Sequence, residues 1–353
     1  MIPNNIPYLI GETAFHHEGD IEFLKTLIKH GAEIGVNAMK FHGLLDLDDY
    51  MVANHDAIEV IRPWCLTEEA LGEVVGYTQQ LELEVVLLCN DVKSIDWAIQ
   101  HSNQIKAIEL HATGLNDIFL LQKGSQFDGT VILGVGGSTL DEIQYAIDFL
   151  RSNGQEDIFL MHGFQNYPTD FKDINLSKMR LLQNLFDLPI GYADHTDPAD
   201  EDNASISVMG AALGFNVLEK HFTHLFGKKR IDAQAAVSLD QMKNTRSLLD
   251  KVMLAFGKND LTMSEAEKRY GDTGPMKKAI VARELIPKGT IISLDNIAFK
   301  RTNESTYLKQ NQVHSLIGLM ATSDISKDEL IDFSKVEYSF KKADFSQFHN
   351  TKK

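Results

Sequence analysis

Cysteine is scarce in this sequence of 353 residues, which contains only Cys65 and Cys89. Two cysteines cannot cross-link a chain of this size, so a disulfide framework is excluded and a reducing compartment, the cytoplasm, is expected. Basic residues are also in deficit, with 34 Lys and Arg against 50 Asp and Glu and a formal net charge of −16. Such an acidic chain repels phosphate backbones, and we therefore expect no nucleic-acid partner.

Long hydrophobic runs are missing as well. No apolar run reaches the roughly 18 residues that a membrane span requires. The first residues contain neither the basic nor the apolar region of a secretory leader, so we expect no membrane partner and a cytoplasmic location. Hydrophobic residues nevertheless make up 43% of the chain and charged residues 24%. This is an ordinary globular composition with enough apolar material to build a core, which excludes disorder as the main state.

Short apolar runs alternate with amphipathic helical patterns over the first 255 or so residues. Helices are predicted over Ile21–His30 and Thr139–Leu150, and Thr139 with Glu142 has the spacing of a capping box. Eight strand-then-helix units in roughly 250 residues are typical of a (β/α)₈ TIM barrel, with an open doubly wound sheet as the alternative. The eight predicted strands are Tyr8–Gly11, Ala38–Phe41, Val85–Cys89, Ala107–Leu110, Val131–Val135, Ile158–Met161, Ile190–Tyr192 and Val217–Glu219.

The character of the sequence changes after the predicted barrel. We expect a catalytic barrel over residues 1–256, a charged and turn-rich linker over 257–277, a small β-rich domain over 278–340 and a loose tail over 341–353. The strands predicted for the small domain are Ala279–Ala282, Thr290–Ile292, Ala298–Lys300 and Leu330–Phe333.

Ionisable side chains recur where the predicted barrel strands end. In a (β/α)₈ barrel the carboxyl ends of the strands carry the catalytic residues, so this distribution indicates an enzyme. The polar strand-end residues are Glu12, Lys40, His42, Asn90, Asp91, Glu109, His111, His162, Asp194, His195, Glu219, Lys220 and His221.

Two histidines end neighbouring predicted strands. His195 and His221 could share one divalent ion through imidazole nitrogens, and Glu219 and Asp232 could be further ligands or could orient water. The alternative is that the two histidines are unrelated and only hydrogen-bond the backbone.

Glu12 and Lys40 each admit more than one interpretation. Glu12 could act as a general acid or base, could hold a sugar hydroxyl, or could form a salt bridge with Lys40 inside the barrel mouth. Lys40 could grip a carboxylate or phosphate, could form a Schiff base, or could serve only as that pairing lysine. The glycine-rich segment Gly134–Thr139 opens a helix and suits an anion, although strand-to-helix turns need such residues in any case.

Several motifs together resemble the sialic acid synthase family, and the resemblance runs over about residues 8–338. It implies a TIM barrel followed by a small antifreeze-like (SAF) domain, and an enzyme that condenses phosphoenolpyruvate with an N-acetylated aminosugar to give a nonulosonic acid. The matching segments are Gly11-Glu12, His17–Asp20, Met39–Phe41, Tyr167–Thr169, Asn175-Leu176, Gly191–Thr196, Glu219–Thr223 and Lys300-Arg301.

The resemblance also implies roles for individual residues. His195 and His221 align with the histidines that hold manganese in the family, so we expect Mn²⁺, with Mg²⁺ or Co²⁺ as alternatives. Glu12 aligns with the acid near the reacting sugar carbon. Arg301 aligns with an arginine that one subunit delivers into the barrel of its partner, which implies a domain-swapped homodimer. Lys40 is expected to be catalytic with Glu12 and the two histidines, and the residues expected to contact substrate are Tyr167, Gln165, His42, Asp91 and Arg301.

Four substitutions depart from the family pattern around the donor. The lysine that grips the phosphate in the family is Glu109 here, and three serine positions are Ala112, Gly134 and Ala193. We therefore expect a condensation of a three-carbon donor with an aminosugar-type aldose, in which phosphoenolpyruvate is a poor fit as the donor. The alternatives are a metal-dependent aldolase or lyase that acts on an unphosphorylated keto acid and a sugar-binding homologue without catalysis.

Overall fold

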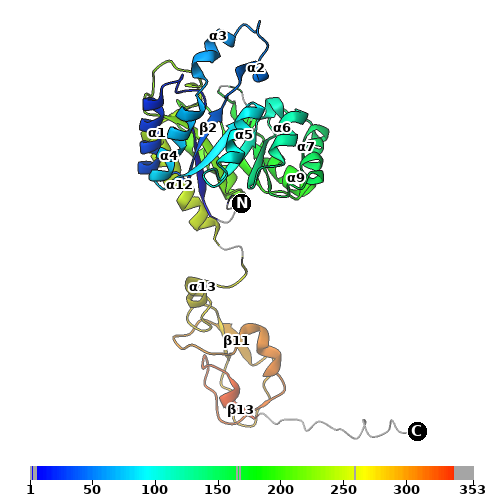
Figure 1. Cartoon of the computed structure of the whole chain (residues 1–353). Helices are drawn as coiled ribbons and strands as arrows, with labels where there is room; N and C mark the ends of the chain where they lie inside the picture. The colour runs from blue at the N-terminus through cyan, green and yellow to red at the C-terminus, as the bar shows by residue number, and fades with distance from the viewer. Residues whose placement is uncertain (1, 3–5, 164–165, 167, 258–259, 338–353) are drawn as a thin grey trace, which may run out of the picture. The chain divides into compact units, whose positions relative to one another are not determined.

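The structure is a computed structural model, and it describes residues 2, 6–163, 166, 168–257 and 260–337 (Figure 1). The chain divides into two compact units, Met1–Asn259 and Asp260–Lys353. Gln165 and Tyr167, both predicted to bind substrate, lie outside the described residues, as does the predicted tail 341–353.

The first unit is a closed parallel barrel, which confirms the predicted fold class. Its strands pair in sequence order from β1 to β8, and β1 also pairs with β8, so these eight strands close into a barrel. A ninth strand, β9 (Val237–Ser238), extends β8 by a short parallel pairing. The barrel strands are β1 Tyr8–Glu12, β2 Ala38–Gly43, β3 Glu84–Cys89, β4 Ala107–Leu110, β5 Thr130–Gly134, β6 Ile158–His162, β7 Ile190–Asp194 and β8 Val217–Thr223.

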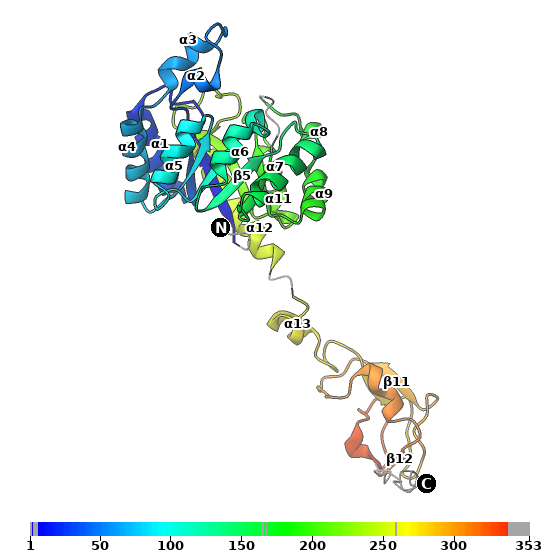
Figure 2. The same cartoon turned by 45° about the vertical axis from the view of Figure 1, so that its right-hand side comes forward.

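Helices surround the strands in both views of the barrel (Figures 1 and 2). The longer helices are α1 Ile21–Ile34, α4 Glu68–Gln80, α5 Val92–Gln100, α6 Ile118–Gly124, α7 Leu140–Ser152, α9 Leu176–Phe186 and α12 Leu239–Phe256. Shorter helical segments are α2 Leu47–Tyr50, α3 Ile58–Ile61, η1 Arg62–Trp64, η2 Ala112–Gly114, α8 Phe171–Ile174, α10 Asn203–Ser207 and α11 Met209–Ala212.

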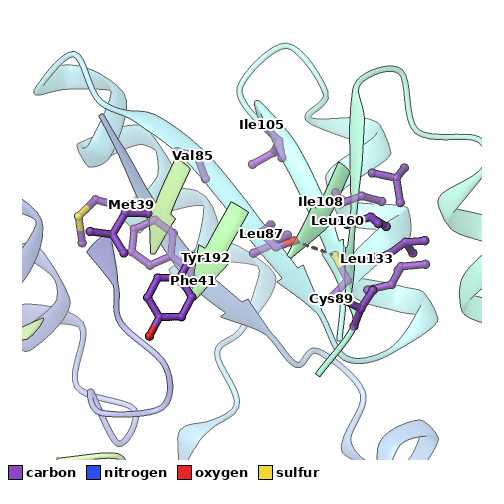
Figure 3. Close-up of a cluster of buried hydrophobic side chains, with 14 of the residues drawn as sticks. Met39, Phe41, Val85, Leu87, Cys89, Ile105, Ile108, Leu133, Leu160 and Tyr192 are labelled. Carbon is purple, nitrogen blue, oxygen red and sulfur yellow. Dashed lines mark hydrogen bonds between the residues drawn. The ribbon is translucent and has the colours of Figure 1, made fainter. Parts of the chain in front are cut away.

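Side chains on the barrel strands alternate between two cores, because successive residues of a strand point to opposite faces. Met39, Phe41, Val85 and Leu87 belong to the larger core between strands and helices, part of which is drawn in Figure 3. The smaller core consists of Ile2, Tyr8, Ile10, Ala38, Val86, Ala107, Ile132, Phe159, Met161, Ala193 and Val217. By this alternation the residues of the smaller core fill the barrel interior.

Local signals in the sequence begin and end the helices. The Asp20 side chain accepts a hydrogen bond from Phe23 N at the start of α1, and Gly35 ends that helix with φ of 86°, a left-handed conformation that favours glycine. The capping box predicted at Thr139 and Glu142 is confirmed at the start of α7. Helices α1 and α7 therefore each begin directly after a polar N-cap residue that the sequence supplies.

The second unit contains short strands around an apolar core of its own. Of its predicted strands, Ala279–Ala282 is confirmed as β10, and Ala298–Lys300 lies within β11 (Ile297–Lys300), antiparallel to β10. The predictions of strands at Thr290–Ile292 and Leu330–Phe333 are wrong, because Ile291 and Leu330 form only isolated bridges and η4 (Phe333–Lys335) begins at Phe333. The other elements are α13 Glu265–Tyr270, η3 Gln310–Ser315, β12 Met320–Ala321 and β13 Val336–Glu337.

Candidate functional site

A polar layer lies in the barrel interior beyond the apolar inner core. On β1, Glu12 lies two residues beyond the inner-core residue Ile10, and on β2, Lys40 lies two residues beyond Ala38. Glu109 on β4 and Glu219 on β8 have the same two-residue offset from inner-core positions. Strand register places Glu12 beside Lys40. Strand alternation therefore directs one cation and three carboxylates into a common space.

Lys40 contacts three carboxylates at once. Its Nζ lies 3.0 Å from Glu12 Oε2, 2.7 Å from Glu109 Oε2 and 2.9 Å from Glu219 Oε1. All four side chains are at most 4% exposed. The predicted salt bridge between Lys40 and Glu12 is thus observed. It is part of a larger cluster of buried ionisable groups. We call these four residues the Lys40 cluster.

The Lys40 cluster has two more negative than positive charges when every carboxyl is ionised. Burial opposes the charged form of Lys40, but Glu109, Glu12 and Glu219 outweigh it and hold the pKa of Lys40 well above its usual value. Burial also raises the pKa of Glu219 and of Glu109, and the neighbouring carboxylates add to the rise. For Glu12, Lys40 and His42 outweigh burial and lower the pKa. The cluster therefore favours an ammonium on Lys40 and a proton retained on Glu219.

Glu12 is fixed on its other side by two further contacts. Its Oε1 accepts a hydrogen bond of 2.9 Å from Ala14 N and lies 3.1 Å from His42 Nε2. Ala14 has a positive φ of 44°, so the chain turns sharply immediately beyond the strand. This turn brings an amide back onto the carboxylate and fixes its orientation.

The two histidines predicted to bind metal lie close together. His221 is on β8 and His195 directly follows β7, and their ring centroids are 5.0 Å apart with the planes inclined at 55°. Burial lowers the pKa of His195 to about 4 and that of His221 well below its usual value. Both imidazoles are therefore neutral near pH 7, and neutral imidazole is the form that binds a metal ion.

The donor set around these histidines is small. Within the described ranges, no group of three or more His, Cys, Asp or Glu side chains has the arrangement of a metal site. Both oxygens of Glu219 instead contact Lys40, at 2.9 and 3.0 Å. The two imidazoles fit a divalent ion as a two-ligand site, whose remaining positions substrate or water would have to fill. Asp232 lines the same cavity, and burial raises its pKa.

A cavity of about 270 Å³ lies over the Lys40 cluster and the two histidines. Small residues form part of its wall. A Cβ added to Gly134 would lie 3.3 Å from Glu109 Oε1 and 3.1 Å from Ala112 N, so the absence of a side chain leaves room beside Glu109. The cavity is lined by Glu12, Ala14, Lys40, His42, Leu88, Glu109, His111, Ala112, Thr113, Gly134, Gly136, Gly137, Ser138, Glu142, Met161, Gly163, Ala193, His195, Glu219, His221 and Asp232.

Two predicted substrate-binding residues do not line this cavity. Asp91 caps α5: its Oδ1 accepts a hydrogen bond from Ser94 N, and its Oδ2 accepts from Leu45 N and Ser94 Oγ. Arg301 belongs to the second unit, where its Nε donates to Pro275 O at 2.7 Å. His42, by contrast, lines the cavity, and its Nε2 contacts Glu12 there.

Two other strand-end residues face away from the cavity. Asp194 and Lys220 form an ion pair in which both side chains are fully buried. Ser207 Oγ donates to Asp194 Oδ2 at 2.5 Å, and Tyr192 OH donates to Asp194 Oδ1 at 3.0 Å. Lys220 outweighs burial and lowers the pKa of Asp194. Side chains alternate between the two faces of a strand, so Lys220 lies on the face of β8 opposite to Glu219 and His221. This alternation could have excluded the pair from the predicted site residues.

Sequence reasoning missed Glu142 as a cavity residue, whereas Ser138 lies in the segment Gly134–Thr139 that the sequence indicated as suited to an anion. Glu142 was assigned only to the capping box, where its Oε2 accepts a hydrogen bond of 2.7 Å from Thr139 N. The available signal was the position of α7 directly after β5, which brings the first turn of the helix to the carboxyl end of the barrel.

Helices able to cross a membrane, by length and apolar character, do not occur among the described residues.

Comparisons with known proteins agree with this architecture. An uncharacterized protein, MJ1065, from Methanocaldococcus jannaschii is 30% identical over 329 residues, covering 92% of this chain and 93% of that protein. An N,N'-diacetyllegionaminic acid synthase from Campylobacter jejuni is 26% identical over 338 residues, covering 92% and 98%. The solved structure of an N-acetylneuraminic acid (sialic acid) synthetase from Leptospira borgpetersenii matches the fold with a TM-score of 0.68 at 21% identity, over 75% of this chain and 90% of that one.

Family models assign both parts of the sequence. Residues 277–337 match the SAF domain, as predicted for the small β-rich domain. Residues 27–260 match the NeuB family, and named relatives of this chain are synthases. The chain is therefore an enzyme and belongs to the NeuB family.

Proposed function

We propose that this enzyme joins a three-carbon donor to an aminosugar-type aldose and releases a nonulosonic-acid-like sugar acid. The observation that carries the proposal is the cavity at the carboxyl end of the barrel, which the Lys40 cluster and two neutral histidines line together. The similarity to a legionaminic acid synthase over 92% of the chain supports a condensation of this class.

Glu12 is the residue that we assign to the sugar. It lines the cavity, its pKa is lowered by Lys40 and His42 against the effect of burial, and an ionised carboxylate accepts hydrogen bonds from sugar hydroxyls. Lys40 is a positioning residue, because its Nζ fixes the carboxylates of Glu12, Glu109 and Glu219. Its role as an ammonium also disfavours a Schiff base, which needs the neutral amine.

His195 and His221 would hold a divalent metal ion, for which Mn²⁺ is our first choice and Mg²⁺ or Co²⁺ the alternatives. Such an ion would act as a Lewis acid on the aldehyde oxygen of the sugar. Because the described residues supply two imidazoles and no third ligand in a metal arrangement, the sugar itself would complete the site. Gln165 and Tyr167 are further proposed contacts of the substrate. We also propose that the small domain of a partner subunit contributes its Arg301, which implies a domain-swapped homodimer.

The test is product formation together with metal binding. The protein is incubated with Mn²⁺, an N-acetylated aminosugar and a panel of three-carbon donors, and mass spectrometry searches for the longer sugar acid. The variant His221→Gln is expected to lose both the product and stoichiometric Mn²⁺, the latter measured by electron paramagnetic resonance.

The control is His162→Gln, which changes a buried strand-end histidine whose Nε2 contacts Ile174 O outside the cavity lining. This variant should retain metal and activity. Absence of a longer sugar acid with every donor, in protein that binds Mn²⁺, contradicts the proposal.

A further inference from the structure

The charge balance of the cavity is unusual for a site that would take an anionic donor. Among the described residues that line it, Lys40 is the only Lys or Arg, whereas five are acidic: Glu12, Glu109, Glu142, Glu219 and Asp232. His111, which also lines the cavity, does not correct the balance, because burial lowers its pKa to about 3.

The single lysine is already engaged by protein carboxyl groups. Its three carboxyl partners lie between 2.7 and 3.0 Å away, and its Nζ donates hydrogen bonds to both oxygens of Glu219. A phosphate oxygen that approached Lys40 would lie against the carboxylates of Glu12 and Glu109, which contact the same Nζ. At these separations like charges in a buried site repel, so the two carboxylates oppose the attraction of Lys40 for a dianion.

The second place where an anion could bind also carries a carboxylate. Gly136, Gly137 and Ser138 lead into α7, whose N-terminal amides would suit a phosphate. There Glu142 Oε2 accepts hydrogen bonds from Thr139 N at 2.7 Å and Thr139 Oγ1 at 3.1 Å. A carboxylate of the protein thus takes up the Thr139 amide at the end of the helix that contributes to the cavity lining.

We propose that Glu109 is a specificity-determining residue that excludes phosphorylated donors, and that the cavity takes a three-carbon carbonyl donor without a phosphate group. The inference rests on the proposed condensation and names its donor class. Glu109 is the member of the Lys40 cluster closest to Lys40 Nζ, and its Oε1 faces the space that Gly134 leaves open. A donor placed there meets a carboxylate where a phosphate would need a cation.

The chemistry balances without phosphate. A carbon-bound proton of the donor passes to a base, the resulting enolate carbon bonds to the aldehyde carbon of the sugar, and the aldehyde oxygen takes up a proton. No bond to phosphorus breaks and no water is consumed. The product mass therefore equals the sum of the donor and the aldose, and inorganic phosphate is not released.

The inference is tested by calorimetric titration of phosphoenolpyruvate and of inorganic phosphate into the full-length protein, with and without Mn²⁺. Wild-type protein is expected to bind neither ligand at micromolar concentration. Glu109→Gln keeps the shape of the side chain and removes one charge next to the dianion, which should tighten phosphoenolpyruvate binding by about a hundredfold or more.

Glu33→Gln is the matched control, because it removes the same charge from an exposed side chain that does not line the cavity. It should leave the affinity unchanged. Micromolar binding of phosphoenolpyruvate to wild-type protein, or equal affinities in wild-type and Glu109→Gln, overturns the role assigned to Glu109.

Product analysis separates this inference from the proposed function. A sugar acid with the summed mass of pyruvate and the aldose supports both. A product formed from phosphoenolpyruvate with release of phosphate overturns the donor class and leaves the condensation standing. If Glu109→Gln gains phosphoenolpyruvate affinity while no donor gives a product, the role of Glu109 is supported and the proposed function fails.

Discussion

Replacing Lys40 with methionine tests the physical account of the barrel interior. The substitution keeps the length of the side chain and removes the one cation that three carboxylates share. Breaking a buried ion pair by removing one partner costs about 3–5 kcal/mol. For a unit of this size, each kcal/mol lowers the melting temperature by about 2–4 °C, so we expect a fall on the order of 10 °C.

The pH dependence of this loss is the sharper part of the prediction. Without Lys40, three buried carboxyls face one another, and their pKa values in the folded variant rise above the unfolded value of about 4.3. The folded variant then keeps protons that the unfolded chain loses, so its stability falls as the pH rises above that value. The destabilisation by Lys40→Met should therefore be larger at pH 8 than at pH 5.5.

Thermal unfolding of the variant and wild type, followed by circular dichroism at both pH values, measures the difference. Lys25→Met is the control, because Lys25 also contacts two carboxylates, Glu22 and Glu73, but at the surface. Exposed pairs contribute little, so this variant should melt close to wild type at either pH. Equal losses in the two variants, or a loss from Lys40→Met that does not grow with pH, would refute the reasoning.

Three further predictions concern groups outside the Lys40 cluster. Burial lowers the pKa of His17 to about 3, so this side chain stays unprotonated in the folded state when the pH falls below about 6.5, while in the unfolded chain it takes up a proton. The free energy of unfolding of wild type should therefore fall by up to about 1.4 kcal/mol per pH unit, and His17→Gln should not show this fall. Urea unfolding at pH 6.5 and pH 5 measures the difference. Lys220→Met leaves Asp194 charged and buried, and should cost about 3–5 kcal/mol in the same assay without changing Mn²⁺ affinity. Thr139→Ala removes the cap of α7 and should cost about 1 kcal/mol, whereas Thr139→Ser should restore most of it.

The fold was predictable where the sequence pattern is long and regular. All eight barrel strands were expected within a few residues of their observed ends, because each is a buried apolar run followed by a helical pattern. The second unit was harder. Its strands β12 and β13 have two residues each, and the apolar runs at Thr290–Ile292 and Leu330–Phe333 contribute to the core without extended pairing. Hydrophobicity alone does not separate these two cases.

The candidate site was predictable in part, for a reason visible in the barrel strands. The criterion of lying at a strand end correctly selected Glu12, Lys40, Glu109, Glu219 and the two histidines as cavity residues. The same criterion also selected residues whose side chains lie on the opposite face of their strand and do not line the cavity. The alternation of period two would have assigned Asp194 and Lys220 to the helix-facing side. The convergence of three carboxylates on Lys40 could not be foreseen, because it depends on which strands lie across the barrel from one another.

The most direct test of the central claim is to observe the new carbon–carbon bond. Pyruvate labelled with ¹³C at its methyl carbon is incubated with the protein, Mn²⁺ and an N-acetylated aminosugar labelled with ¹³C at its aldehyde carbon, with phosphoenolpyruvate labelled at the equivalent carbon in a parallel sample. We predict that the pyruvate sample develops a one-bond ¹³C–¹³C coupling between the two labels in its NMR spectrum. Unchanged single resonances in both samples, with protein that has bound Mn²⁺, would contradict the assignment of this cavity to a condensation.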